Sequence, residues 1–174
     1  ITVRPTDQTD AKGRHRPGPE NMEWTQIPTP TPASGEVRVA VKAVGMNRAD
    51  LLQRQGLYPP PPGVSETMGL EVCGTIDALG ADVTGVTVGQ RVAVAGVHGA
   101  WAEYFVAPAT ALVPVPDAIS DEAAAQLIAM PFSAISLLEF LDVKSGDWVI
   151  QNTANGAVGK ILARLATARG VHVV

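Results

Sequence analysis

The stretch QNTANGAVGKILARLA, residues 151–166, decides how the fold of this chain is interpreted. A short apolar run precedes it, and a helix-like run that ends at Gly170 follows it. Between the two runs, Ala154, Gly156 and Gly159 have the spacing of a phosphate-binding turn. Backbone N–H groups and the helix dipole both attract anions at the N-terminus of a helix. The stretch therefore predicts an anion site between a strand and a helix.

These three positions follow the pattern G-x-G-x-x-G, with Ala154 in place of the first glycine. We expect Gly156 to take special backbone angles and to leave room for a pyrophosphate, and Gly159 to let the helix pack closely on the strand. A strand before the turn and a helix after it are the context that the motif requires. We therefore predict a dinucleotide site here, with close packing in the absence of any ligand as the alternative.

From Ser120 onward the sequence has the pattern of a β-α-β unit. Residues 120–143 predict a helical region that begins at a capping Ser or Asp, and we expect Pro131 to divide it into two helical segments. Residues 145–152 are apolar on both faces, as in a buried parallel sheet, and residues 171–174 start another strand. The residue that distinguishes NAD from NADP lies about 20 residues beyond the first glycine of such motifs, past the end of this sequence.

The first part of the chain predicts a mostly antiparallel β structure. Residues 36–47 alternate between apolar and polar side chains, which indicates a half-buried strand. Residues 47–58 predict a short helix with Asn47 as its N-cap and Gly56 as its break. Further strands are predicted at residues 69–80, 89–96, 102–108 and 111–116. Short strands of this kind, joined by turns, indicate a β barrel or sandwich.

Composition excludes several classes of function. The chain has 174 residues, 17% of them charged, with a formal net charge of −4 and no run of Lys or Arg, which argues against a nucleic-acid partner. No apolar stretch is long enough to cross a membrane. The one cysteine, Cys73, forms no internal disulfide and no cysteine-based zinc site, and we expect a buried thiol rather than a nucleophile. A reducing compartment, the cytoplasm, fits best. Residues 4–16 predict a solvated loop, and a transit-peptide remnant that directs the protein to the mitochondrial matrix is the alternative.

Four stretches resemble the medium-chain dehydrogenase/reductase superfamily. GMNRADLLQRQGLYPPPPG (45–63) and GLEVCGTIDALG (69–80) are similar to its zinc-independent quinone oxidoreductases, and HGAWAEYFVAP (98–108) and IQNTANGAVG (150–159) to its 2-enoyl thioester reductases. The resemblance implies a mixed α/β fold that continues beyond this sequence. A GroES-like β-barrel catalytic domain would occupy residues 1–119. The first part of a Rossmann nucleotide-binding domain would occupy residues 120–174.

The resemblance also bears on metal binding. The zinc alcohol dehydrogenases of the superfamily carry a cysteine near the position of Asn47 and Gly-His-Glu where this chain has Gly69, Leu70 and Glu71. Leucine cannot ligate a metal, and the three histidines of the chain have no ligand spacing. We therefore expect no zinc, and we expect Glu71 to serve as a hydrogen-bond partner.

Without zinc, a conjugated acceptor is the easier substrate. Hydride addition to a quinone or an enoyl group spreads the negative charge into an enolate, which one or two hydrogen-bond donors can hold. The resemblance implies an oxidoreductase that transfers a hydride from NADPH to a quinone or an α,β-unsaturated carbonyl compound such as an enoyl thioester, as a homodimer when complete. NADH stays open as the cofactor. The alternative is a non-catalytic truncated module that associates with a partner or binds nucleotide weakly.

The resemblance assigns site residues in both parts of the chain. Tyr58 is the candidate donor to the substrate, with a packing tyrosine as the alternative. Asn47 would bind the nicotinamide ribose or orient the substrate, and it can act as helix N-cap as well. Ser133 takes a place near the nicotinamide where the family often has Thr. The turn would bind the cofactor through Asn155, Gly156, Ala157, Val158 and Gly159.

Four further residues carry expectations of their own. Asp50 and Arg54 have the i, i+4 spacing of a surface ion pair, with a structural brace under the site as the alternative. Trp101 and Phe105 are expected in the core, although Trp101 could line the substrate pocket.

Overall fold

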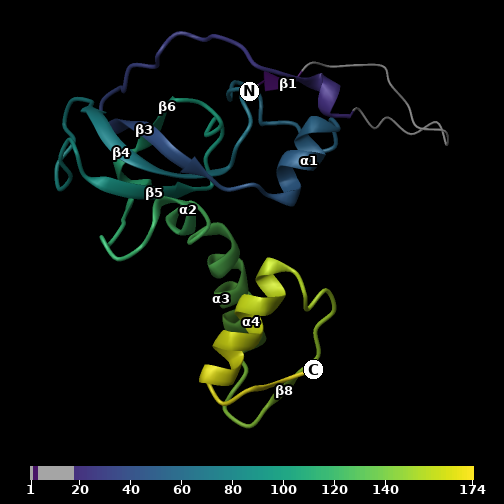
Figure 1. Cartoon of the computed structure of the whole chain (residues 1–174). Helices are drawn as coiled ribbons and strands as arrows, with labels where there is room; N and C mark the ends of the chain where they lie inside the picture. The colour runs from purple at the N-terminus through teal and green to yellow at the C-terminus, as the bar shows by residue number, and fades with distance from the viewer. Residues whose placement is uncertain (1, 4–17) are drawn as a thin grey trace. The chain divides into compact units, whose positions relative to one another are not determined.

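The computed structural model describes residues 2–3 and 18–174, which form two compact units, Ile1–Gln126 and Leu127–Val174 (Figure 1). The solvated loop predicted at residues 4–16 lies outside the described residues. Each unit has its own core, and each is described here by itself.

The first unit is built on a five-stranded antiparallel sheet with the strand order β6-β3-β4-β5-β7. Its strands are β3 (Glu36–Val44), β4 (Glu71–Leu79), β5 (Arg91–Ala95), β6 (Tyr104–Pro108) and β7 (Val113–Pro114). A separate antiparallel pair joins β1 (Thr2–Val3) to β2 (Met22–Glu23), and two short 3-10 helices span Pro19–Asn21 and Ala109–Ala111. The prediction of a mostly antiparallel β structure is therefore confirmed.

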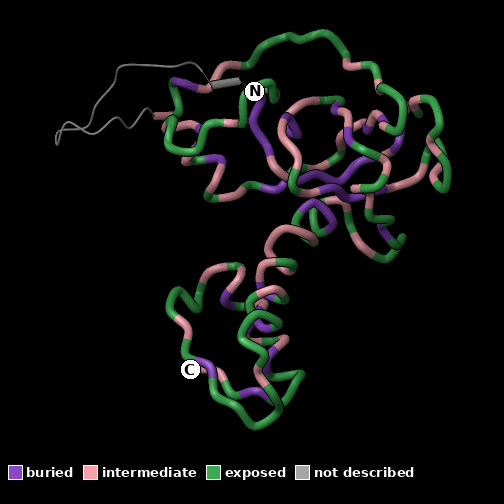
Figure 2. Tube along the Cα trace, turned by 180° about the vertical axis from the view of Figure 1, so that it is seen from behind, coloured by how far each residue is buried: buried purple, intermediate pink, exposed green. Residues whose placement is uncertain are grey.

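The predicted alternation of β3 is also confirmed, because Val37 and Val39 are fully buried while Arg38 between them is only partly buried. Strand β4 lies at the centre of the sheet, and its first four residues, 71–74, are all buried. Figure 2 shows buried residues gathered along the strands of this unit. The core cluster consists of Val37, Val39, Val72, Ile76, Val92, Val94, Ala100, Phe105 and Ala107. Phe105 therefore belongs to the core, as predicted.

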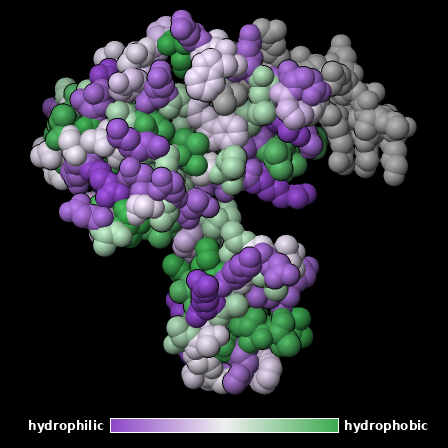
Figure 3. Space-filling model, viewed as in Figure 1, coloured by the Kyte–Doolittle hydropathy of each residue, from purple (hydrophilic) through white to green (hydrophobic). Residues whose placement is uncertain are grey.

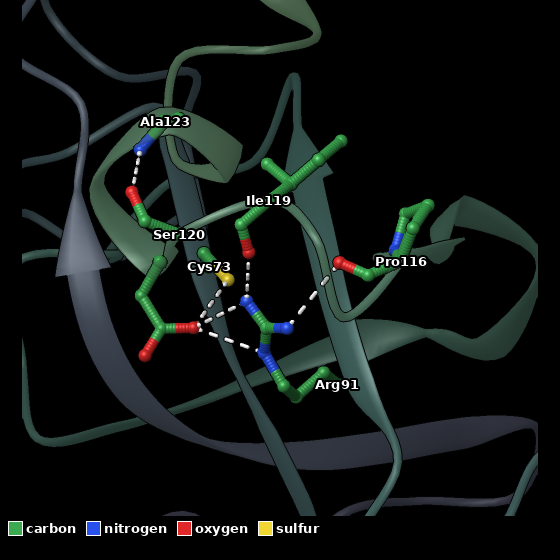
Figure 4. A network of polar contacts seen from close by, with 7 residues as sticks. Cys73, Arg91, Pro116, Ile119, Ser120 and Ala123 are labelled. Carbon is green, nitrogen blue, oxygen red and sulfur yellow. Dashed lines mark hydrogen bonds and ion pairs between the residues drawn. The ribbon is translucent and has the colours of Figure 1, made fainter.

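Helix α2 (Asp121–Ala124) packs against β3 and β4 and so belongs to the first unit, although the sequence changes character at Ser120. Figure 4 shows how it is held. Arg91 on β5 donates from Nε and Nη2 to Oδ1 of Asp121 at 3.1 and 2.9 Å, and Nη2 also donates to the carbonyl of Ile119 at 2.7 Å. Ser120 caps the helix by accepting the N–H of Ala123 at 3.3 Å. One guanidinium thus ties a strand to the start of a helix.

The thiol of Cys73 lies beside the same carboxylate, with Sγ 3.5 Å from Oδ1 of Asp121. Cys73 is fully buried, as predicted. Burial raises the pKa of this thiol to about 11, and the hydrogen bond to Asp121 adds to the shift. The thiolate is therefore scarce at neutral pH.

The second unit contains one β-α-β crossover, as predicted. Strands β8 (Trp148–Val149) and β9 (His172–Val173) pair in parallel, and helix α4 (Ala157–Ala168) connects them. Helix α3 (Ala129–Leu141) packs on α4, and the ion pair between Arg169 and Glu139, at 2.7 Å, also links this helical pair. The buried cluster consists of Ala134, Leu138, Val149, Leu162, Ala166 and Val171.

Two details of this unit differ from the prediction. Pro131 does not divide a helix; the break falls between α2 and α3, and Pro131 lies in the first turn of α3. The N–H groups of a first turn have no intrahelical acceptor, so proline costs little there. The strand predicted at residues 145–152 is shorter and is not buried on both faces. Val149 is 8% exposed, but Trp148 and Ile150 are 68% and 86% exposed. The ring of Trp148 stacks on that of His172 in β9, with centroids 4.5 Å apart.

Large apolar side chains are exposed in both units, and Figure 3 shows hydrophobic residues at the surface of each. In the second unit the most exposed are Phe132, Phe140, Trp148, Ile150 and Val174.

Replacing Arg91 tests the link between β5 and α2. Arg91→Ala removes its bonds to Asp121 and to two carbonyl oxygens, and we expect it to lower the free energy of unfolding by about 1–2 kcal/mol. Urea unfolding followed by circular dichroism measures this. Ser34→Ala, which removes only an exposed hydrogen bond to Asp82, is the control and should change stability by less than about 0.5 kcal/mol. Equal midpoints for the two variants would contradict the role of Arg91.

Thiol labelling tests the burial of Cys73. With a raised pKa and no exposed surface, the native thiol should react with Ellman's reagent at pH 8 more than about 100-fold slower than it does in urea. Similar rates in the two conditions would show that Cys73 is open to solvent.

Candidate functional site

Asn47 immediately precedes helix α1 (Arg48–Arg54) and is its N-cap, as predicted, with an extended backbone. Its side-chain nitrogen Nδ2 donates to Oε1 of Glu71 at 3.0 Å. Glu71 begins strand β4 and is 2% exposed. The expectation that Glu71 serves as a hydrogen-bond partner is confirmed. The start of a helix and the start of the central strand are therefore joined by one buried polar contact.

Asp50, in the first turn of α1, also holds Asn47 in place. It is 1% exposed, and its Oδ2 accepts the backbone N–H of Asn47 at 2.6 Å. Burial raises the pKa of Asp50, and hydrogen bonds from the N–H groups of Asn47 and Gly69 oppose the rise. The predicted surface ion pair is wrong, because Asp50 is buried at the helix start and forms no ion pair with Arg54 among the described residues. The alternative, a structural brace, describes Asp50 better.

Gly45 is required where it stands by the approach of Glu71. A Cβ atom at Gly45 would lie 2.3 Å from Oε1 and 2.5 Å from Cγ of Glu71, closer than real Cβ atoms come to other atoms. The indole nitrogen of Trp101 donates to the carbonyl oxygen of Gly45 at 3.4 Å. Three contacts therefore hold residues 45–50 near the Glu71 carboxylate. They are the hydrogen bond from Asn47 to Glu71, the hydrogen bond from Trp101 to Gly45, and the close packing of Glu71 on Gly45.

Tyr58 follows the other end of α1, after Gly56, whose φ of 70° ends the helix. The backbone N–H of Tyr58 donates to the carbonyl of Leu52 at 3.3 Å, which holds the loop on the helix. The side chain is 49% exposed. A half-exposed phenol is free to meet a ligand, and its role as a donor stays a prediction.

The glycine turn in the second unit differs from the expectation at two residues. Gly156 has an ordinary φ of −71°, so it takes no special backbone angle; the left-handed residue of the turn is Thr153, with φ of 57°. Gly159 does allow a close approach, but to the turn residues Thr153 and Ala154 and not, as was expected, to the strand. A Cβ at Gly159 would lie 2.8 Å from both Cα and O of Ala154. The turn is held further by Gln151, whose Nε2 donates to the carbonyl of Gly159 at 3.2 Å.

The N-terminus of α4 is accessible. Asn155 and Ala157 are exposed, Val158 packs partly on the core, and Gly159 is buried. The first N–H groups of a helix have no acceptor within the helix and are available to an anion.

Ser133 lies in α3, where its hydroxyl donates to the carbonyl of Ala129 at 2.9 Å. Its proton is therefore used inside the helix, while its oxygen can still accept a hydrogen bond. The first unit thus carries Asn47 and Tyr58, and the second carries Ser133 and the glycine turn.

Two cavities of the first unit share Trp101 and Trp24. One, of about 440 Å³, also borders Thr67, and the other, of about 420 Å³, also borders Val44 and Met46. Trp101 is only partly buried and is not among the core residues, so the expectation that it lies in the core is wrong. It lines both cavities, and its place in a substrate pocket stays a prediction. Sequence reasoning missed Trp24 and Met46, which are 80% and 83% exposed. Met46 could have been found from the sequence, because it directly precedes the candidate residue Asn47.

Within residues 2–3 and 18–174, no three His, Cys, Asp or Glu side chains come together in a way that could hold a metal ion. In the same part of the chain, no helix combines the length and the hydropathy that crossing a membrane requires.

Comparison with known proteins gives a consistent answer. Residues 33–117 match the alcohol dehydrogenase GroES-like domain family. The chain is 36% identical over 159 residues to a quinone oxidoreductase of Pseudomonas aeruginosa. The aligned region covers 90% of this chain and 49% of the relative.

Solved structures agree. The Escherichia coli quinone oxidoreductase complexed with NADPH has a TM-score of 0.82 at 31% identity, over 91% of this chain and 49% of that one. The CurK enoyl reductase has a TM-score of 0.82 at 27% identity, over 88% of this chain and 49% of that one. The chain spans about half the length of these relatives. The match to the GroES-like family, the parallel β-α-β unit with its glycine turn, and these relatives together show that the chain belongs to the medium-chain dehydrogenase/reductase superfamily, with the quinone oxidoreductases and enoyl reductases, and carries the amino-terminal half of their fold.

Proposed function

We propose that the whole protein is an NADPH-dependent oxidoreductase that works without zinc and reduces a quinone or an α,β-unsaturated carbonyl compound such as an enoyl thioester. The observation that carries this proposal is the hydrogen bond between Asn47 and Glu71. It occupies the place where zinc-dependent members of the superfamily are expected to hold the metal. An amide and a carboxylate that satisfy each other, with Leu70 between Gly69 and Glu71, offer a cation too few ligands.

The glycine turn is the proposed cofactor site. Its features fit a pyrophosphate: an accessible helix N-terminus, Gly156 without a side chain at the cap, and a turn held rigid by Gly159. The bound cofactor would supply the hydride. The preference for NADPH rests on relatives such as the Escherichia coli enzyme, which was solved with NADPH. NADH remains the alternative.

The proposed chemistry asks two things of the first unit. Once the hydride has reached the substrate, an enolate or a quinol anion needs a proton or a hydrogen bond, which the half-exposed hydroxyl of Tyr58 can donate. Asn47 would contact the nicotinamide ribose or the substrate. One well-placed donor in a site that excludes water contributes roughly 3 kcal/mol to stabilising such an anion.

A second candidate function for these 174 residues is binding to a partner, without catalysis. Phe140 and Ile150 are 88% and 86% exposed, which favours association with another polypeptide. In that case the chain is a non-catalytic module that binds a partner and binds nucleotide weakly.

Gly156→Ala tests the cofactor site. Because φ at Gly156 is −71°, alanine is compatible with the backbone angle. Its Cβ would meet only Thr153, at 3.2 Å from the carbonyl oxygen and 3.6 Å from Cγ2, so a small local shift accommodates it. We expect an unchanged melting temperature and a dissociation constant for NADPH that rises about tenfold or more, since the methyl group would crowd the phosphate. NADPH fluorescence in a titration of the complete protein measures this.

Thr167→Ala, near the far end of the same helix, is the matched control for that titration and should bind NADPH like the wild type. If Gly156→Ala also binds like the wild type, the turn does not hold the pyrophosphate.

Tyr58→Phe tests the donor. It should lower turnover of the complete enzyme about tenfold or more, with little change in KM for NADPH. Assays with a quinone and with a 2-enoyl thioester would also show which substrate class is reduced. Tyr104→Phe is the control, because Tyr104 lies on β6 with its ring under the guanidinium of Arg38. Unchanged turnover of Tyr58→Phe would remove Tyr58 from the mechanism.

A further inference from the structure

The buried contacts around Asn47 determine more than the start of a helix. Asn47 is gripped twice: its side-chain Nδ2 donates to Glu71, at 3.0 Å, and its backbone N–H donates to Asp50, at 2.6 Å. Both carboxylates are at most 2% exposed. The contact with Asp50 is the usual capping box of a helix start, in which the side chain at position N3 accepts the backbone N–H of the N-cap residue. The contact with Glu71 is additional, because an N-cap does not need a partner for its side-chain NH2 group.

Glu71 cannot easily turn away from this contact. Its side chain fills the space that Gly45 leaves by having no Cβ, and its own backbone carbonyl accepts the N–H of Gly45 at 3.1 Å. The backbone of Glu71, the first residue of the central strand β4, pairs with Ala95 at the end of β5. The carboxylate is therefore held by the sheet, and Asn47 orients to it.

The contact also orients the amide of Asn47. A planar amide that turns its NH2 group toward an accepting oxygen turns its carbonyl oxygen the other way. Nδ2 donates one of its two hydrogens to Glu71. The acceptor that Asn47 offers to a ligand is Oδ1, which faces the backbone N–H of Asp50 in the capping box and keeps a second lone pair.

We propose that Glu71 and Asp50 are positioning residues that fix Asn47 so that its Oδ1 accepts a hydrogen bond from the bound cofactor. This inference rests on the proposed function, in which Asn47 contacts a ligand. It assigns the ligand group by its chemistry. The acceptor fits a hydroxyl or an amide N–H, both of which the nicotinamide riboside moiety carries, and it would repel the oxygen of an enolate.

The proposal therefore divides the work between two residues. Asn47 faces the cofactor as an acceptor, and the donor to the reduced substrate is left to Tyr58. Asp50 contributes by holding the backbone of Asn47, with Oδ1 of Asp50 buried and unpartnered among the described residues.

A double-mutant cycle in the complete protein tests this inference, with NADPH binding as the readout. Glu71→Met replaces the carboxylate by an apolar group of similar size, which buried sites often tolerate. It should raise the dissociation constant for NADPH about tenfold, while Glu71→Gln, which keeps an accepting oxygen, should stay within about threefold. Asn47→Ala should weaken binding to a similar extent.

The cycle is decided by the double variant. If Glu71 acts through Asn47, then Glu71→Met made in the Asn47→Ala background should have no further effect on NADPH affinity. Additive losses would overturn the proposal and leave Glu71 with a structural role only. If Asn47→Ala binds NADPH normally while Gly156→Ala does not, positioning is refuted but cofactor binding stands. If neither variant changes the affinity, the proposed function itself fails.

A second measurement needs no variant of Glu71. The side-chain amide protons of Asn47, assigned in the 174-residue chain by comparison with Asn47→Ala, should exchange with water at least about tenfold slower than those of the exposed Asn152 and Asn155. Equal exchange rates would show that the amide is not held by Glu71, and would overturn the proposal.

Discussion

The buried carboxylate of Glu71 is the constraint on which the arrangement of the first unit depends. Taking a charged group out of water is costly unless hydrogen bonds replace the water. Glu71, on the central strand, is only 2% exposed, and neighbouring residues supply the hydrogen bonds that its carboxylate needs. Gly45 leaves the space, Asn47 supplies the donor, and Trp101 ties the backbone of Gly45 in place through its indole N–H. Gly45, Asn47 and Trp101 therefore all contribute to accommodating the same buried carboxylate.

The same kind of solution appears where α2 meets the sheet. Asp121 lies next to a buried thiol, and Arg91 supplies two hydrogen bonds to its carboxylate and others to carbonyl oxygens in the loop before the helix (Figure 4). Charge-assisted bonds are stronger than neutral ones, so a single side chain can anchor a helix of one turn. Helix α2 therefore belongs to the sheet on which it packs, and the sequence pattern that groups it with the following helix reflects only their shared helical character.

The sequence predicts those features that depend on local periodicity. The alternating residues of β3, the parallel strand pair with its helix, and the close packing at Gly159 all follow from side-chain patterns that repeat along one element. What it misses depends on the third dimension. The i, i+4 spacing of Asp50 and Arg54 does not say which face of a short helix is buried. An apolar run such as residues 148–150 does not say whether a second layer covers it. The angle at Gly156 could not be read, because Thr153 takes the left-handed position instead.

The contact between Asn47 and Glu71 also bears on the proposed reaction, which would proceed without zinc. A cation at this position would stabilise negative charge on the substrate directly. A neutral amide that already donates one hydrogen to a carboxylate carries no positive charge and cannot replace a cation in this role. The electrophilic help must then come from elsewhere, and a substrate that spreads its own charge needs less of it. Under the proposed function, the pairing of Asn47 with Glu71 would favour conjugated acceptors over simple carbonyl compounds, because it leaves stabilisation of the anion to a hydrogen-bond donor rather than to a fixed positive charge.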